Sequence, residues 1–188
     1  MTLANIITLM RIAMIPFFVM AAVYYAQGVK AGVPREWLHW TAVGLFALTA
    51  GTDGVDGFVA RRMKQVTRLG SILDPIADKA LLLSALLLLG LNPGEAFMPM
   101  PLWFPILVIS RDLIVVLGVA VVFMMGRSFE IQPHWTGKAA SALQMITVGL
   151  VLMNLWDLYW LPPLVLATLC TLVSGGIYVV QGARKLSA

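Results

Sequence analysis

The stretch Gly51-Thr-Asp-Gly-Val-Asp-Gly57, GTDGVDG, directly follows the apolar run WTAVGLFALTA at residues 40–50. A second acidic stretch, LDPIADK at residues 73–79, comes shortly afterwards. A charged side chain at membrane depth is costly unless it is paired or hydrated, so intramembrane carboxylates indicate a functional polar site. The two stretches together predict hydrophobic helices that enclose an acidic cluster.

The composition of the chain extends this prediction to the whole sequence. Of its 188 residues, 60% are hydrophobic and only 12% are charged, which leaves too little polar surface for a soluble domain of this size. Apolar segments of about 20 residues, the length that spans a bilayer, recur throughout. We expect an all-α integral membrane protein with six transmembrane helices, at roughly 12–28, 38–60, 71–91, 101–125, 139–156 and 162–182.

The connections between these segments are too short to hold a second domain, so residues 1–188 are predicted to form a single membrane domain. The leader MTLANIITLM, residues 1–10, is amphipathic and predicts a short helix that lies in the membrane interface.

The distribution of Lys and Arg predicts the orientation of the chain. Six spans place the basic connection at 61–70 on the same side as both termini, and that side carries most of the basic residues. By the positive-inside rule it is cytoplasmic, which predicts a multi-pass protein of the cell inner membrane with its site facing the cytoplasm. This band accounts for most of the net charge of +4, so no nucleic-acid partner is expected. Its residues are Arg11, Arg61, Arg62, Lys64, Arg68, Arg127, Lys138, Arg184 and Lys185, against Lys30 and Arg35 on the other side.

The four central carboxylates form two pairs with helical spacing. Asp53 and Asp56 are three residues apart and Asp74 and Asp78 are four apart, so each pair projects from one face of its helix. An antiparallel hairpin can bring the pairs together, where four carboxylates would repel one another. Two divalent cations, Mg²⁺ or Mn²⁺, would offset that charge, because these ions prefer oxygen ligands. Two such ions about 4 Å apart are an arrangement that serves phosphoryl displacement.

The small residues around the first pair allow two interpretations. Gly51, Gly54, Gly57 and Ala60 repeat every three residues and would let a flat or bulky ligand approach the helix closely. Such a strip also serves close packing between membrane helices. Beside the Asp pair, the ligand interpretation is favoured. Pro75 is expected to bend the next helix, either to make room for a ligand or as an incidental kink.

These residues resemble the signature of the CDP-alcohol phosphotransferase family, D-x2-D-G-x2-A-R-x8-G-x3-D-x3-D. All its fixed positions are filled, and the NIITLMR segment near the start also agrees with the family. The matching residues are Asp53, Asp56, Gly57, Ala60, Arg61, Gly70, Asp74 and Asp78.

The resemblance implies a reaction and a set of roles. A hydroxyl of an acceptor alcohol would attack the β-phosphorus of CDP-diacylglycerol, and CMP would leave. The four Asp residues would hold the two metal ions, with Asp78 also the base for the hydroxyl proton and Asp74 beside it at the catalytic centre. Spacing alone does not distinguish base from ligand. The nucleotide would be bound by Asp53, Gly57, Ala60, Arg61 and Gly70, and the family also suggests a homodimer.

Two further segments bear on the acceptor. VISRDLIVV at 108–116 and HWTGKAASALQM at 134–145 resemble the branch that makes phosphatidylglycerophosphate and cardiolipin. Arg111 and Lys138 are candidates for holding an acceptor phosphate. The alternatives are that Arg111 is satisfied beside Asp112 by other helices and that Lys138 is a topological anchor.

Phosphatidylglycerophosphate synthases usually carry another Arg eight residues beyond the first, where this chain has Val119. Glycerol-3-phosphate is dianionic and should need that cation, so the sequence favours phosphatidylglycerol as acceptor, as in CMP-forming cardiolipin synthases. Glycerol-3-phosphate is the alternative. A small ion or proton transporter is a more distant possibility, which the scarcity of ionisable groups in the first, fifth and sixth segments disfavours.

Overall fold

The computed structural model describes residues 3–63, 70–92, 95–124, 135–155 and 161–187. Within the helices, the side chains at 3–7, 53–72, 119–120, 122–123, 179 and 181–187 are outside the described part. The regular elements of the described chain are six α-helices, in agreement with the all-α prediction. They are α1 (Leu3–Lys30), α2 (Glu36–Met63), α3 (Gly70–Leu91), α4 (Trp103–Met124), α5 (Trp135–Leu152) and α7 (Leu161–Ser187).

Each helix overlaps one of the predicted apolar segments. By length and composition, two of the described segments could cross a membrane: Thr8–Lys30, with mean hydropathy 1.7, and Leu161–Tyr178, with mean hydropathy 1.6. The prediction of six transmembrane spans therefore remains a prediction.

The expected separate interfacial helix at the start of the chain is wrong. Residues from Leu3 onward form the first turns of α1, and that helix continues through Pro16 to Lys30. Thr8 and Arg11 are both 1% exposed and bond to side chains of α3. Thr8 of the leader and the following Arg11 therefore face a neighbouring helix.

The described chain divides into two compact units. Unit 1 comprises residues 1–100 and 148–156, and unit 2 comprises residues 101–147 and 157–188. Helices α1, α2 and α3 pack together in unit 1, whereas α4 packs against α7 in unit 2. Residues 135–147 of α5 belong to unit 2 and its last turn belongs to unit 1.

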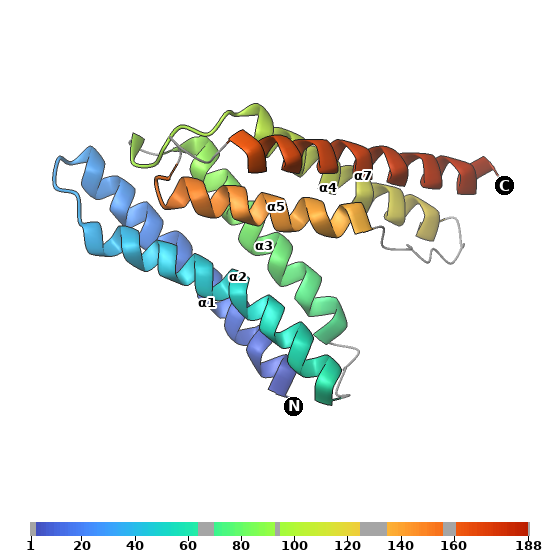
Figure 1. Cartoon of the computed structure of the whole chain (residues 1–188), viewed down its shortest axis with the longest axis horizontal. Coiled ribbons are helices and arrows are strands. Elements are labelled where there is room, and N and C mark those ends of the chain that lie inside the picture. Colours follow the sequence, from blue (N-terminus) through green and yellow to red (C-terminus); the bar gives the residue numbers. More distant parts are fainter. Residues whose placement is uncertain (1–2, 64–69, 93–94, 125–134, 156–160, 188) are drawn as a thin grey trace. The chain divides into compact units, whose positions relative to one another are not determined.

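A tight turn joins α1 and α2 into an antiparallel hairpin (Figure 1). The amide of Val33 donates to the carbonyl of Gly28, and the amide of Gly32 donates to that of Val29, which is the Schellman pattern at a helix end. Gly32 has φ +73°, and a Cβ on Gly28 would lie 2.9 Å from the Val33 oxygen. Both positions therefore require glycine.

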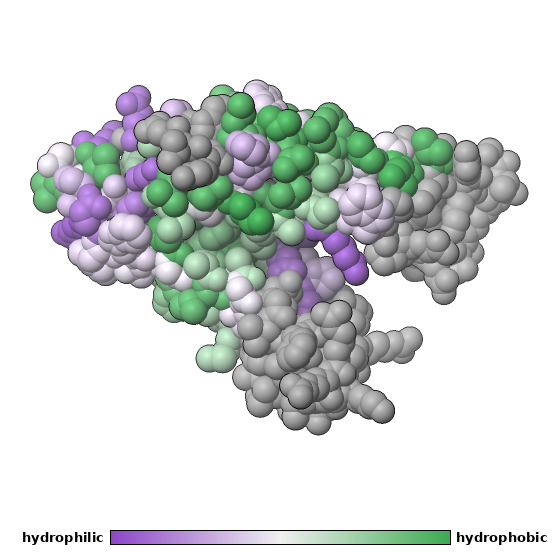
Figure 2. Space-filling model, in the orientation of Figure 1, coloured by the Kyte–Doolittle hydropathy of each residue, from purple (hydrophilic) through white to green (hydrophobic). Residues whose placement is uncertain are grey.

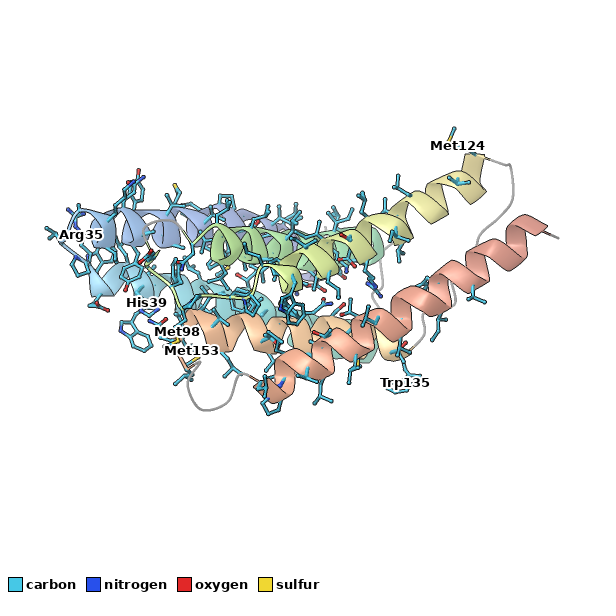
Figure 3. The ribbon with its side chains drawn as sticks, turned by 90° about the horizontal axis from the view of Figure 1, so that it is seen from above. Arg35, His39, Met98, Met124, Trp135 and Met153 are labelled. Carbon is cyan, nitrogen blue, oxygen red and sulfur yellow. The ribbon has the colours of Figure 1, made fainter. Side chains whose placement is uncertain are left out.

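An aromatic and polar cluster packs at the end of unit 1 that is remote from the start of α1. His39 is 4% exposed, stacks on Tyr25 at 4.9 Å between ring centroids, and its Nε2 lies 2.7 Å from the carbonyl oxygen of Leu152. Figure 3 shows His39 at the end of unit 1 that also carries Arg35, Met98 and Met153. This packing fixes the hairpin at the end remote from the start of α1.

The surface of the chain carries many large hydrophobic side chains. They occur on every helix, and Figure 2 shows hydrophobic residues spread over the face in view. Soluble monomers rarely expose extended apolar patches, so this surface indicates contact with lipid. Representative members are Phe17, Trp40, Leu87, Ile106, Ile146 and Leu169.

Candidate active site

The end of α2 and the start of α3 carry the acidic stretches to one end of unit 1, where α1 also begins (Figure 1). Residues 53–61 are helical within α2, and residues 70–78 are helical within α3. Both Asp pairs therefore lie on helical backbone, in two helices that contact each other within unit 1. Six predicted site residues have side chains outside the described part: Asp53, Asp56, Gly57, Ala60, Arg61 and Gly70.

The two carboxylates of α3 each receive a donor from α1. The Oγ1 hydroxyl of Thr8 donates to Oδ1 of Asp74 at 2.6 Å. The Nη1 group of Arg11 lies 3.1 Å from Oδ1 of Asp78, as both a hydrogen bond and an ion pair. Thr8 and Arg11 are three residues apart on α1 and their partners are four apart on α3, so the bonds form two successive rungs between the helices.

The two members of the ion pair differ in exposure. The side chain of Arg11 is 0% exposed, whereas that of Asp78 is 31% exposed. A fully buried guanidinium loses its hydration and needs an anionic partner, which Asp78 supplies. Asp78 can thus offset the charge of Arg11 and still be reached from outside the helix bundle.

Sequence reasoning missed the roles of Thr8 and Arg11. It assigned Arg11 to the basic inner band and left Thr8 in an interfacial leader. A signal was present in NIITLMR, where Thr8 and Arg11 have the spacing of one helical face. Only the packing of α1 on α3 shows which residues that face meets.

A divalent cation such as Mg²⁺ or Mn²⁺ needs several oxygen ligands. No group of three or more His, Cys, Asp or Glu side chains that could hold a metal occurs among the described residues. The described carboxylates include Asp74 and Asp78 but not the α2 pair. Carboxylate oxygens in a half-buried setting fit Mg²⁺ or Mn²⁺, and a carboxylate has lone pairs for a helix donor and a cation together. The chemistry of Asp74 and Asp78 therefore fits the predicted ions.

Unit 2 holds a second polar cluster, centred on Arg111. Its Nη1 group lies 2.6 Å from Oδ1 of Asp112, and its Nη2 group donates to Oγ of Ser174 at 3.1 Å. The guanidinium carbon lies 5.4 Å from the ring centroid of Tyr178, within the range of a cation–π contact. Residues of α4 and α7 thus fix the position of this side chain.

Two glycines leave space for Arg111. A Cβ on Gly137 of α5 would lie 3.3 Å from Nη2 of Arg111 and 3.1 Å from the Tyr178 hydroxyl. A Cβ on Gly175 would lie 3.3 Å from Cγ of Arg111. Sequence reasoning did not identify Ser174, Tyr178 or Gly137, because their relation to Arg111 depends on helix packing.

The Arg111 cluster bears on both interpretations of that residue. The guanidinium group of Arg111 bonds to Asp112 and Ser174 and packs on Tyr178, as expected if Arg111 has a structural role. Its buried Nε has no hydrogen-bond partner among the described residues. Lys138 is exposed and directly follows Gly137, so it lies next to the point where Arg111 approaches α5. The two predicted acceptor residues therefore come from neighbouring parts of unit 2.

The fold and the acidic stretches define an α-helical enzyme with its carboxylates on adjoining helices of a hydrophobic bundle. The chain matches the description CDP-alcohol phosphatidyltransferase over residues 1–177. It belongs to this membrane-embedded family, and it is a CDP-alcohol phosphatidyltransferase. The transporter alternative is accordingly wrong.

Several relatives cover most of the chain. It is 33% identical over 188 residues to a probable phosphatidylglycerophosphate synthase of Mycobacterium tuberculosis, covering 98% of this chain and 83% of the relative. It is 32% identical over 157 residues to the CDP-diacylglycerol–glycerol-3-phosphate 3-phosphatidyltransferase of Escherichia coli K12, covering 82% and 80%. A Sodalis glossinidius protein of the same name is 34% identical over 142 residues, covering 76% and 71%.

Proposed function

We propose that this enzyme transfers the phosphatidyl group of CDP-diacylglycerol to the hydroxyl of glycerol-3-phosphate and releases CMP. The observation that carries the proposal is the similarity, over most of the chain, to relatives named for this acceptor. It favours the alternative over phosphatidylglycerol, which the sequence alone had favoured because of Val119. The missing Arg at that position is a weaker argument than similarity along the whole chain.

The reaction exchanges one phosphorus–oxygen bond for another. The acceptor oxygen bonds to the β-phosphorus of CDP-diacylglycerol, the bond from that phosphorus to the bridging oxygen breaks, and CMP takes the electron pair. Asp78 accepts the proton of the acceptor hydroxyl, since a half-exposed carboxylate on the face of α3 can reach a substrate. Asp74, four residues earlier, lies beside it on that face.

Two divalent cations, Mg²⁺ or Mn²⁺, would supply neutralisation of the charge that develops on the phosphoryl oxygens. Asp53, Asp56, Asp74 and Asp78 would hold them. The family signature supports this assignment for the α2 pair, and the donor chemistry at Asp74 and Asp78 supports it for α3. The same signature supports nucleotide binding by Asp53, Gly57, Ala60, Arg61 and Gly70.

Arg111 and Lys138 bind the acceptor phosphate in this proposal. A phosphate monoester carries a charge of about −1.5 to −2 near neutral pH, so it needs more than one cationic partner. Arg111 is held in place by Ser174 and Tyr178 with its side chain 11% exposed, and Lys138 is exposed nearby. These two cations would serve a dianionic acceptor without an Arg at position 119.

We further propose where the reaction takes place relative to the membrane. Six spans would place the acidic end of unit 1 at the cytoplasmic face of the inner membrane, where the basic residues gather and where water-soluble glycerol-3-phosphate is present. The homodimer suggested by the family resemblance remains part of the proposal.

The acceptor is tested with purified protein, CDP-diacylglycerol and Mg²⁺, by measuring CMP release with each alcohol in turn. We expect release with glycerol-3-phosphate and only background release with phosphatidylglycerol. Arg111→Gln should raise the KM for glycerol-3-phosphate at least tenfold, because a charge-assisted hydrogen bond contributes about 1.5–3 kcal/mol. Release with phosphatidylglycerol alone would overturn the proposed acceptor.

A further inference from the structure

The first turns of α1 touch the candidate active site at two points. Thr8 and Arg11 bond to Asp74 and Asp78, the two α3 residues to which the proposed function gives a role in the chemistry. Both α1 residues are 1% exposed, and each donates to Oδ1 of its carboxylate partner. The donors of both contacts are therefore buried, while the two carboxylates that accept from them are partly exposed.

These contacts would also hold α1 against α3, but helix packing alone is a poor reason for a buried Arg. Removing a guanidinium from water costs several kcal/mol, and well-packed hydrophobic residues of similar volume stabilise a protein equally well or better than a buried ion pair. Helices α1 and α3 also contact each other, and both bury apolar residues, among them Phe18 and Ala22 of α1 and Leu81 of α3. The polar rungs are therefore better explained by their effect on the carboxylates.

We propose that Thr8 and Arg11 are positioning residues, which fix the side-chain orientations of Asp74 and Asp78 for the reaction. This inference rests on the proposed function, since it assumes that both carboxylates act in the chemistry. Residues that orient metal-binding side chains typically change metal affinity or activity by about 10- to 100-fold when mutated. The two rungs differ in kind: Thr8 is a neutral donor, and Arg11 adds a fixed positive charge.

The Thr8 rung is tested through metal affinity, because Thr8→Val removes a donor without changing charge or shape greatly. Mn²⁺ is titrated into the full-length protein in detergent, and free Mn²⁺ is measured by electron paramagnetic resonance. We expect Thr8→Val to weaken binding about 10- to 100-fold and Thr8→Ser to stay within about threefold of wild type.

Thr147→Val is the matched control for this rung. Thr147 is also 1% exposed, and its hydroxyl bonds to the carbonyl of Leu143 in its own helix. The Thr147→Val substitution removes a buried Thr hydroxyl away from the acidic site, so it should leave Mn²⁺ affinity unchanged. A thermal unfolding curve for each variant confirms that the folded protein is being titrated.

The Arg11 rung is tested through kinetics, because Arg11→Lys keeps the charge and removes the planar fork. We expect kcat to fall about tenfold or more, since small misplacements of reacting groups lower turnover strongly. The KM for CDP-diacylglycerol should stay within about threefold of wild type. Arg35→Lys, in the exposed turn before α2, is the matched control and should change neither constant.

The outcomes separate this inference from the function on which it rests. If Asp74→Asn fails to weaken Mn²⁺ binding, the metal site itself is refuted and the inference with it. If Asp74→Asn abolishes binding while Thr8→Val binds like Thr147→Val, the inference alone is overturned for Thr8. Wild-type kcat in Arg11→Lys would overturn it for Arg11.

Discussion

Individual residues in this enzyme owe their roles to the charges they meet after folding. Arg11 is fully buried because Asp78 offsets its charge, and Arg111 is held by Asp112, Ser174 and the ring of Tyr178. In both clusters the basic residue comes from one helix and at least one partner comes from another. Small changes in the packing around such a cation should therefore alter substrate binding more than they alter the free energy of unfolding.

Substitution of Gly137 is predicted to disturb the position of Arg111. Gly137→Ala would place a Cβ 3.3 Å from Nη2 of Arg111 and 3.1 Å from the Tyr178 hydroxyl, so both side-chain ends must shift. We expect the KM for glycerol-3-phosphate to rise about tenfold, the loss of roughly one hydrogen bond, with the KM for CDP-diacylglycerol unchanged. Gly176→Ala is the control, because a Cβ there meets no atom within 4 Å. Equal KM values for both variants would refute the role given to Arg111.

At the scale of elements, the α1–α2 hairpin positions the start of α1 and the end of α2 at the same end of unit 1. Its turn depends on Gly28, whose missing side chain lets the Val33 carbonyl approach, and on Gly32 in the left-handed region. Since α1 also supplies the donors to Asp74 and Asp78, the geometry of this turn and that of the acidic site are linked through one helix.

Gly28→Ala tests the turn. Its Cβ would lie 2.9 Å from a backbone oxygen, which cannot move without opening the turn, so the variant should lose about 1–3 kcal/mol of stability. A thermal unfolding assay in detergent should show a lower midpoint than wild type. Gly44→Ala in α2, where a Cβ meets no atom within 4 Å, should leave the midpoint unchanged or raise it. A midpoint for Gly28→Ala equal to that of Gly44→Ala would contradict this account.

The number and approximate ranges of the described helices could be predicted from the sequence, because apolar segments of membrane length are separated by short polar connections. The start of α1 could not. Residues 1–10 have the pattern of an interfacial helix, and only the bonds to α3 show that Thr8 and the following Arg11 are buried against another helix. Local hydrophobic pattern does not reveal which polar groups will find partners.

For the whole molecule, the spacing of the Asp residues predicted the family and the hairpin that carries the site. The acceptor was harder to predict, because the preference for phosphatidylglycerol rested on one missing cation, at Val119. The proposed acceptor site draws on several helices of unit 2, where Ser174, Tyr178 and Gly137 lie against Arg111. Such residues, far apart in the sequence, carry no shared local motif.

We propose that two divalent cations lie between α2 and α3, held by Asp53, Asp56, Asp74 and Asp78. Anomalous diffraction from crystals of the protein grown with Mn²⁺ and CDP tests this proposal directly. We predict two Mn²⁺ peaks within bonding distance of carboxylate oxygens from both helices, with the diphosphate of CDP beside them. Carboxylates that point apart, with no anomalous peak among them, would contradict the claim.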